Sequence, residues 1–512
     1  MSRLYKFPGG LKLAGHKTIS TRQPISKAAI PDRLFVPLGQ HIGSPAECTV
    51  EKGQRVLKGQ TIGAVTDYVA APVHAPSSGT VVDIQKFPAA HASSLPSDVI
   101  IIEPDGKDEW LEREPIPDIT EMDPSELRNL IRCAGIVGLG GAAFPTFIKL
   151  NPAGHQISRL ILNGAECEPY ITCDDMLMRE RPHEIIDGAK IMRHALNAAQ
   201  VIIAIEENKP EAIASLQALA SEFDWLQIQA IPVIYPTGGE RQLIKVLTGK
   251  DVPSKGLPLD LGMVVSNVAT AAAVHHAIDH QQPLISRIIT VTGSGVKSPQ
   301  NFEVLIGTPI SDLIELAGGY TEDADRLVVG GPMMGITLKT DATPVVKASN
   351  CLLVQTPPDH AGEAIIRPCI RCGECVKVCP VKLLPQQLYW FSQAKYLDDL
   401  QSHNLFDCIE CGCCTVVCPS HIPLVQYFRF GKSEIWKKEQ ETIKADLARE
   451  RADAKTSRVE RIKAEKKAQH AARAKKTAAA ADRKKEIEAA VARTKAKKTA
   501  DIDTAINQNT EN

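Results

Sequence analysis

The sequence has no apolar run long enough to cross a bilayer. Its most apolar region, residues 261–277, contains Ser266, Asn267, His275 and His276, and these polar side chains make it unsuitable as a membrane span. The first ten residues lack the apolar core of a secretory signal peptide. We therefore expect a cytosolic protein, in which any membrane contact is made through partners or through a basic tail.

The chain also has little net charge, −1, from 59 Lys and Arg against 60 Asp and Glu. This balance conceals a basic segment, because residues 441–500 hold 19 basic and 9 acidic residues. The two signs are interleaved there and no aromatic residue follows Trp436, which favours a solvated helix or a disordered tail over a surface for lipid or nucleic acid. A length of 512 residues predicts three or more domains.

What the sequence does have is two runs of the form C-x2-C-x2-C-x3-C-P. Bacterial ferredoxins hold [4Fe-4S] clusters with this pattern, and in two-cluster members the fourth Cys of each run binds the other cluster. We therefore assign Cys369, Cys372, Cys375 and Cys418 to one cluster, and Cys408, Cys411, Cys414 and Cys379 to a second.

Zinc and disulfides are the alternatives for these cysteines. Structural zinc sites usually use two pairs of ligands separated by a longer loop, and disulfides require an oxidising compartment that nothing in the sequence indicates. Cys413 does not fit the spacing and is interpreted as a bystander, and the remaining scattered cysteines are interpreted as reduced thiols.

The region before the cysteine runs contains two segments with different sequence patterns. Residues 30–105 contain short Val-rich runs broken by Gly and Pro, which predict a small all-β unit. This stretch resembles biotinyl- and lipoyl-type barrel-sandwich domains, although Thr66-Asp67-Tyr68 stands where those carry their modified Lys. Residues 116–280 alternate short apolar runs with helical patterns, which predicts an α/β domain with a parallel sheet.

Four motifs lie within the predicted α/β domain. They are a glycine-rich loop at residues 138–149, Asn-Gly-Ala-Glu-Cys-Glu-Pro at 163–169, Tyr-Pro-Thr-Gly-Gly-Glu at 235–240, and a segment at 264–270 that leads into a helix. Backbone N–H groups of a glycine loop, together with Lys149, suit a phosphate or a flat ring. Each motif alone is equally consistent with a solvated turn or a helix cap.

As a set, the four motifs resemble those of the flavin- and NADH-binding subunit of respiratory complex I. Together with the cysteine runs, they are similar to the C subunit of Rnf (Rsx) ion-translocating electron transport complexes. The resemblance covers about residues 1–430. Leu139 and Ala165 replace an Arg and an Asp of the complex I pattern.

The resemblance implies roles for individual residues. FMN phosphate and ring would be cradled by Gly138, Gly140, Gly141 and Lys149, and the flavin would be hydrogen-bonded by Asn163, Asn267 and Thr270. NADH would be held by the catalytic residues Glu166 and Glu168, with the catalytic Tyr235 and the cofactor-binding Glu240 near the stacked rings.

The expected fold is thus multidomain, α/β and α+β. It comprises a barrel-sandwich domain at 1–115 without an acceptor Lys, a Rossmann-like FMN/NADH domain at 116–280, a β-grasp module at 281–340, a helical two-cluster ferredoxin module at 360–430, and an Ala/Lys-rich tail at 431–512. Within the β-grasp module, the segment 330–335 is interpreted as a packed turn in preference to a ligand loop.

By resemblance, the protein would be the electron-input subunit of a membrane-bound complex, peripheral on the cytoplasmic side of a bacterial inner membrane. Electrons would pass between NADH and membrane partners, including a ferredoxin-like subunit, through FMN and two [4Fe-4S] clusters. Two other hypotheses remain open. One is a soluble NAD(P)H:ferredoxin-type oxidoreductase, and the other is a flavin-free iron–sulfur relay or docking scaffold.

Overall fold

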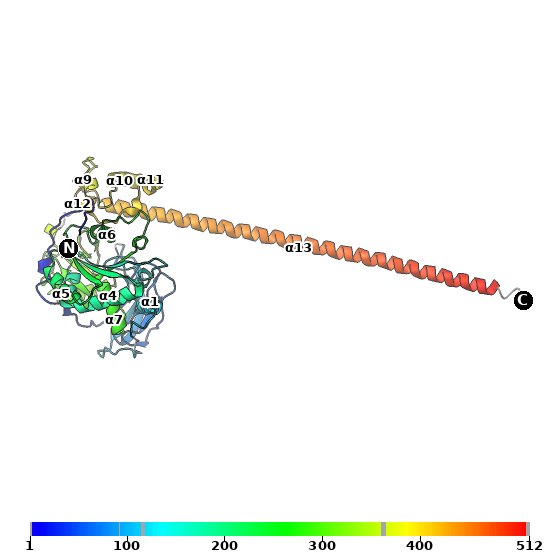
Figure 1. Ribbon diagram of the computed structural model, residues 1–512, viewed down its shortest axis with the longest axis horizontal. Coiled ribbons are helices and arrows are strands. Elements are labelled where there is room, and N and C mark those ends of the chain that lie inside the picture. The colour runs from blue at the N-terminus through cyan, green and yellow to red at the C-terminus, as the bar shows by residue number, and fades with distance from the viewer. Residues whose placement is uncertain (1–2, 92, 114–117, 360–364, 508–512) are drawn as a thin grey trace. The chain divides into compact units, whose positions relative to one another are not determined.

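The computed structural model describes residues 3–91, 93–113, 118–359 and 365–507 (Figure 1). The chain divides into two compact units, Met1–Lys432 and Ser433–Asn512. The predicted domain limits at 115/116 and at 360, and the last five residues of the predicted tail, lie outside the described residues.

Residues 34–104 form the small antiparallel β unit that the turn pattern predicts. Its strands are β2 (Leu34–Pro37), β3 (Glu47–Cys48), β4 (Arg55–Val56), β5 (Thr61–Ala64), β6 (Val73–His74), β7 (Gly79–Pro88) and β8 (Pro96–Pro104). They make two sheets, β2-β8-β7-β4 and β3-β5-β6. Leu34 and Ile62, one from each sheet, belong to the same buried apolar cluster, so the two sheets share one core.

The predicted first domain, 1–115, includes residues 3–27, but these residues lie outside the β unit. The amide of Tyr5 donates to the carbonyl of Val246, Leu11 forms a β-bridge with Tyr235, and Gly10 N–H donates to Val378 O. Strand β1 (Ser26–Lys27) pairs with a strand near residue 302. The N-terminal segment therefore ties the later domains together, and such non-local pairing leaves no mark in the local pattern.

The predicted parallel sheet is present, with strand order β11-β10-β9-β12. Its elements are α1 (Pro124–Cys133), α2 (Thr146–Lys149), β9 (Arg159–Gly164), α3 (Cys173–Glu180), α4 (Pro182–Leu196), β10 (Gln200–Glu206), α5 (Pro210–Ala220), β11 (Leu226–Ile231), α6 (Glu240–Thr248), β12 (Met263–Asn267) and α7 (Val268–Asp279). After β11 the chain crosses to the other side of β9, so the strand order reverses between β9 and β12. Asn163 and Asn267 face each other across this point, which is where open α/β sheets bind ligands.

A six-stranded mixed sheet follows, with order β1-β14-β13-β17-β15-β16. Its elements are β13 (Ser286–Thr292), β14 (Gln300–Leu305), α8 (Ile310–Leu316), β15 (Arg326–Val329), β16 (Ile336–Thr337) and β17 (Cys351–Gln355). The sheet extends beyond the predicted limit of 340, because the fully buried β17 lies between β13 and β15. The pairing of β17 with β13 joins residues about sixty apart, which a local pattern does not reveal.

The cysteine runs lie among short helices: α9 (Glu374–Lys377), α10 (Pro385–Ala394), α11 (Leu397–Ser402), α12 (Cys413–Val416) and the start of α13 (Leu424–Asn507). Short 3-10 turns lie at Lys17–Ile19, Pro258–Leu261, Pro357–Asp359 and Leu405–Asp407. The second unit is the remainder of α13, whose side chains from 436 to 502 are all exposed, as a solvated helix requires. Within the described residues, no helix combines the length and the apolarity that a membrane span needs.

Candidate functional site

The eight cysteines of the two runs line two separate pockets. The inner pocket is lined by Cys379, Cys408, Cys411 and Cys414 of the two runs, and also by Cys413. The outer pocket is lined by Cys369, Cys372, Cys375 and Cys418. In each pocket the fourth Cys of one run joins three cysteines of the other, as in two-cluster ferredoxins. Four thiols around one small cavity are a suitable donor set for an iron–sulfur cluster, so the residues fit the group that the spacing predicts.

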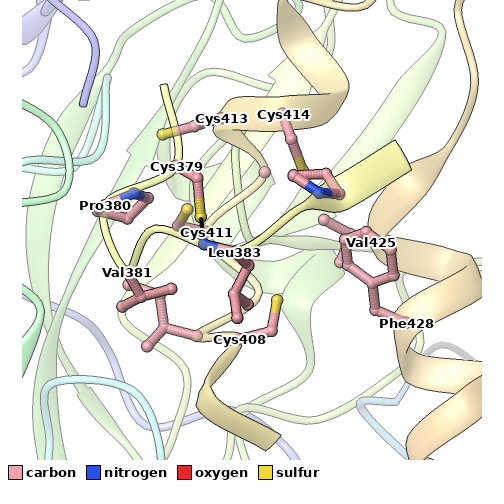
Figure 2. A pocket seen from close by; sticks show the side chains of 13 residues that line it. Cys379, Pro380, Val381, Leu383, Cys408, Cys411, Cys413, Cys414, Val425 and Phe428 are labelled. Atoms are coloured by element: carbon pink, nitrogen blue, oxygen red, sulfur yellow. Dashed lines mark hydrogen bonds between the residues drawn. The ribbon is translucent and has the colours of Figure 1, made fainter. Parts of the chain in front are cut away.

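Figure 2 presents the inner pocket, with Val425 and Phe428 of α13 closing one side. The backbone amide of Leu383 donates to Cys379 Sγ at 3.3 Å, so the pocket already supplies an N–H group to a sulfur. Lys432 Nζ donates to the carbonyl of Cys408 at 2.7 Å and holds that end of the loop. In this view the Cys413 sulfur points away from the space between the other four sulfurs, in keeping with its interpretation as a bystander.

The glycine-rich loop of the α/β domain faces open space. Gly140 and Gly141 are exposed, and a Cβ at Gly141 (φ +143°) would meet no atom within 4 Å. A Cβ at Gly140 would instead meet Asn267 at 3.0 Å, so this glycine allows the loop to lie against the start of α7. A flat group can thus approach the backbone at Gly141, and the loop fits a flavin.

The side chains of Asn163, Asn267 and Thr270 are already hydrogen-bonded to the protein. Asn163 Nδ2 donates to Gly238 O at 2.8 Å, and Asn267 Oδ1 accepts from the amides of Ala269 and Thr270 at the start of α7. Thr270 Oγ1 accepts from the amide of Leu139 at 2.9 Å. These three residues, which the sequence predicts as flavin contacts, hold the loops of the site in position.

Lys149 and Glu240 form an ion pair at the same edge of the sheet. Lys149 Nζ lies 2.6 Å from Glu240 Oε1 and 2.7 Å from the carbonyl of Val265, and both side chains are about one third exposed. The ammonium group is therefore fixed near the glycine loop while remaining open to solvent, as a phosphate contact requires.

Glu166 lies in a buried network that the sequence did not predict. Lys17 Nζ donates to the carbonyls of Glu166, Glu168 and Ile171 at 2.6–2.8 Å. Glu166 Oε1 accepts from the amide of Asp174, and burial raises the pKa of Glu166. Because Lys17 comes from the N-terminal segment, about 150 residues away, local pattern alone does not identify it.

Glu168 is held by the loop between β15 and β16. Its carboxylate accepts from the amides of Met333 at 3.1 Å and Met334 at 2.8 Å, while burial raises the pKa of Glu168 to about 7. The segment 330–335, interpreted from sequence as a packed turn, therefore binds a predicted NADH-site carboxylate. A nicotinamide that used Glu168 would have to share it with this loop.

Tyr235 joins the α/β domain to the inner pocket. Its hydroxyl donates to the carbonyl of Cys411 at 2.7 Å, and its ring is 3% exposed. Tyr235, Cys411 and Cys413 form one apolar cluster, against which Cys167 and Met333 pack. The motif around Cys167 therefore packs directly against the cysteines of the inner pocket.

We expect Tyr235→Phe to destabilise the protein by about 1–3 kcal/mol, because the Cys411 carbonyl would lose a buried hydrogen bond. Anaerobic thermal unfolding measures the change. Tyr68→Phe is the control, since Tyr68 is exposed. Equal melting temperatures for Tyr235→Phe and the wild type would contradict a structural role for this contact.

Arg287 is a second residue that the sequence analysis missed. Its guanidinium is buried, and Nη2 donates to the carbonyl of Leu139 in the glycine loop at 3.3 Å, so β13 supports that loop. The available sequence signal was a charged residue at the start of a strand-like run. Asp174, which accepts from Asn267 Nδ2 at 2.6 Å, had no comparable signal.

Four family models match the chain in this order. They are an RnfC barrel sandwich hybrid domain at residues 5–107, a Nuo51 FMN-binding domain at 131–276, an SLBB domain at 288–337 and a 4Fe-4S dicluster domain at 368–422. The barrel-sandwich, flavin-type and dicluster parts of the expected fold are thereby confirmed.

Curated relatives match over nearly the whole chain. The C subunit of the ion-translocating oxidoreductase complex of Pseudomonas aeruginosa is 50% identical over 92% of this chain and 61% of its own length. The proteins of the same name from Yersinia enterocolitica and Yersinia pestis are 46% and 45% identical over 91% of this chain, which spans 67% and 75% of their lengths. The chain is thus shorter than the relatives it matches.

Among solved structures, a chain of an NAD+-reducing [NiFe]-hydrogenase in its H2-reduced state is 22% identical over 62% of this chain and 63% of its own length, with a TM-score of 0.45. A likeness this weak carries no functional argument.

A flavin-type α/β domain in contact with the inner of two cysteine-lined pockets defines a redox protein of the flavin and iron–sulfur class. The sequence identities with the curated relatives define its family. The chain belongs to the family of C subunits of ion-translocating oxidoreductase complexes.

Proposed function

We propose that this chain passes electrons between NADH and the other subunits of a membrane-bound ion-translocating complex, one of them ferredoxin-like. FMN would occupy the α/β domain, and one [4Fe-4S] cluster each of the two pockets. When bound, FMN would exchange a hydride with NADH and single electrons with the clusters. The protein would be peripheral, on the cytoplasmic side of an inner membrane.

The observation that carries the proposal is the contact between Tyr235 and Cys411. It holds the inner pocket against the motifs of the α/β domain, so electrons would reach the inner pocket first and the outer pocket second. The strand order β11-β10-β9-β12 matches the first four strands of the Rossmann order, which supports that assignment for the α/β domain. We assign the six-stranded sheet to the β-grasp type on its helix α8 and mixed strands.

The test is an absorption spectrum of the anaerobically purified protein with flavin and iron quantified. We expect about one flavin and about eight iron atoms per chain. Addition of NADH should bleach both flavin and cluster absorption. Bleaching by dithionite but not by NADH would reject NADH as the electron source.

A flavin-free relay is the second candidate, because Glu240 and the Val265 carbonyl already bind the Lys149 ammonium. Iron without flavin in the same measurement would favour it.

Lys149→Met separates these candidates. We expect at least about a tenfold loss of FMN affinity, since the phosphate would lose its cationic partner, and no loss for riboflavin, which has no phosphate. Fluorescence titration of the flavin-depleted protein measures both. Lys245→Met is the matched control, because Lys245 is also ion-paired in the same domain. Equal weakening of FMN and riboflavin would contradict a phosphate contact.

A further inference from the structure

The loop between β15 and β16, residues 330–335, covers the carboxylate of Glu168. Glu168 Oε2 accepts from the amide of Met333 at 3.1 Å, and Oε1 accepts from the amide of Met334 at 2.8 Å. Each carboxylate oxygen therefore has a loop amide as its partner. The loop thus occupies positions from which a ligand would donate hydrogen bonds to Glu168.

Gly331 brings the loop backbone directly against this carboxylate. A Cβ at Gly331 would overlap Glu168 Oε2 and lie 2.7 Å from Cδ. The φ of Gly331 is not in the left-handed region, so the position requires the absence of a side chain and not an unusual conformation. Burial raises the pKa of Glu168 to about 7, as expected where the loop excludes water from the carboxylate. A ligand can therefore reach Glu168 only after the loop has moved.

The loop is held on its other side by the residues around the inner pocket. Met333 packs against the apolar cluster around Tyr235, and its carbonyl oxygen would lie 2.8 Å from a Cβ at Gly412. The loop thus has two attachments, one by packing and one by hydrogen bonds to Glu168. The hydrogen bonds are the attachment that the donors of a ligand can replace.

We propose that the 330–335 loop is a latch that closes the nicotinamide site by binding Glu168. This inference rests on the proposed function, since it takes Glu168 to bind the nicotinamide half of NADH. The carboxamide and ribose of that half carry N–H and O–H donors, which can replace the two loop amides. Binding of the nucleotide must then release the loop, so its apparent affinity is reduced by the fraction of molecules in which the latch is open.

Gly331→Ala opens the latch without changing Glu168. The added methyl group would collide with the carboxylate, although Ala can adopt the backbone conformation. The probe is NAD+, which binds without reducing the protein, and its Kd is measured by calorimetry on the full-length, cofactor-loaded protein. We expect this Kd to fall at least about fivefold, because the open fraction rises. The Kd of ADP, which lacks the nicotinamide half, should stay within about twofold.

Gly295→Ala is the matched control for crowding. A Cβ at Gly295 would overlap the side chain of Val354 near the same sheet, and its φ is also outside the left-handed region. The Kd of NAD+ should stay within about twofold in this variant. A second control repeats Gly331→Ala in a Glu168→Ala background, where the substitution should no longer tighten NAD+ binding, because the carboxylate that it displaces is gone.

Hydrogen exchange tests the latch in the wild-type protein, so the test does not depend on any variant folding. The amides of Met333 and Met334 should exchange faster when NAD+ is bound, because they lose their acceptor. ADP should leave their exchange unchanged.

Failure of the latch is distinguishable from failure of the proposed function. The latch alone is overturned if wild-type protein binds NAD+ and the two amides stay protected. It is also overturned if Gly331→Ala leaves the Kd of NAD+ unchanged or raises it, or if Gly295→Ala lowers it equally. Absence of NAD+ and NADH binding in both the wild type and Gly331→Ala would reject the proposed function and the latch together. Binding to Gly331→Ala alone would support the latch.

Discussion

Gly141→Val should yield a protein that keeps both clusters but retains less than about a tenth of the FMN of the wild type. The backbone at Gly141 has φ +143° and faces open space, so a branched side chain would occupy the volume into which a flavin must move. NADH should then fail to reduce the clusters, while dithionite should still reduce them. Flavin released by heat, and bleaching by each reductant, measure the two effects.

The backbone strain of this substitution needs its own control. A non-glycine residue in a sparsely populated conformation costs about 1–3 kcal/mol, which by itself lowers stability. Gly154 has φ +86° in the same domain, and a Cβ there also meets nothing within 4 Å. Gly154→Val should therefore be strained but retain FMN. Full NADH-driven cluster reduction in Gly141→Val would place the flavin elsewhere.

The two kinds of site differ in how far the sequence predicts them. The cysteine runs are local patterns whose spacing is set by the cluster, so their grouping into two pockets follows from the sequence. The motifs that follow β9 and β12 meet at the switch between these two strands, as strand ends of a parallel sheet should. The other two motifs reach the same point, through Gly238 beside Asn163 and Gly140 beside Asn267.

What the sequence does not predict are the contacts between distant segments. Lys17 reaches the Glu166 carbonyl across about 150 residues, and the Met333 amide reaches Glu168 across 165. In the sequence, strand β17 is an ordinary apolar stretch, and only the structure reveals that it pairs with β13. Residues expected to touch the flavin, such as Asn267, turn out to cap a helix and hold a loop, because backbone amides at a helix start need acceptors.

Crossed ligation gives the second large expected effect. Cys418→Ser should disturb the cluster of the outer pocket, although Cys418 is closer in sequence to the inner-pocket residues Cys408, Cys411 and Cys414. Cys408→Ser should disturb the inner-pocket cluster, and Cys379→Ser should give the same phenotype as Cys408→Ser. Each substitution should remove up to about four of eight iron atoms, with the remaining cluster giving the EPR signal of its own pocket.

The controls for this prediction are two cysteines that are not expected to bind a cluster. Cys133 is exposed and remote from both runs, and Cys133→Ser should retain all iron. Cys413→Ser should do the same, since the Cys413 sulfur points out of the inner pocket in Figure 2. If Cys418→Ser and Cys408→Ser abolish the same EPR signal, each run holds its own cluster. The proposed order of electron transfer, from the inner pocket beside Tyr235 to the outer pocket, would then be wrong. That order assumes that each pocket holds one cluster bound by cysteines of both runs.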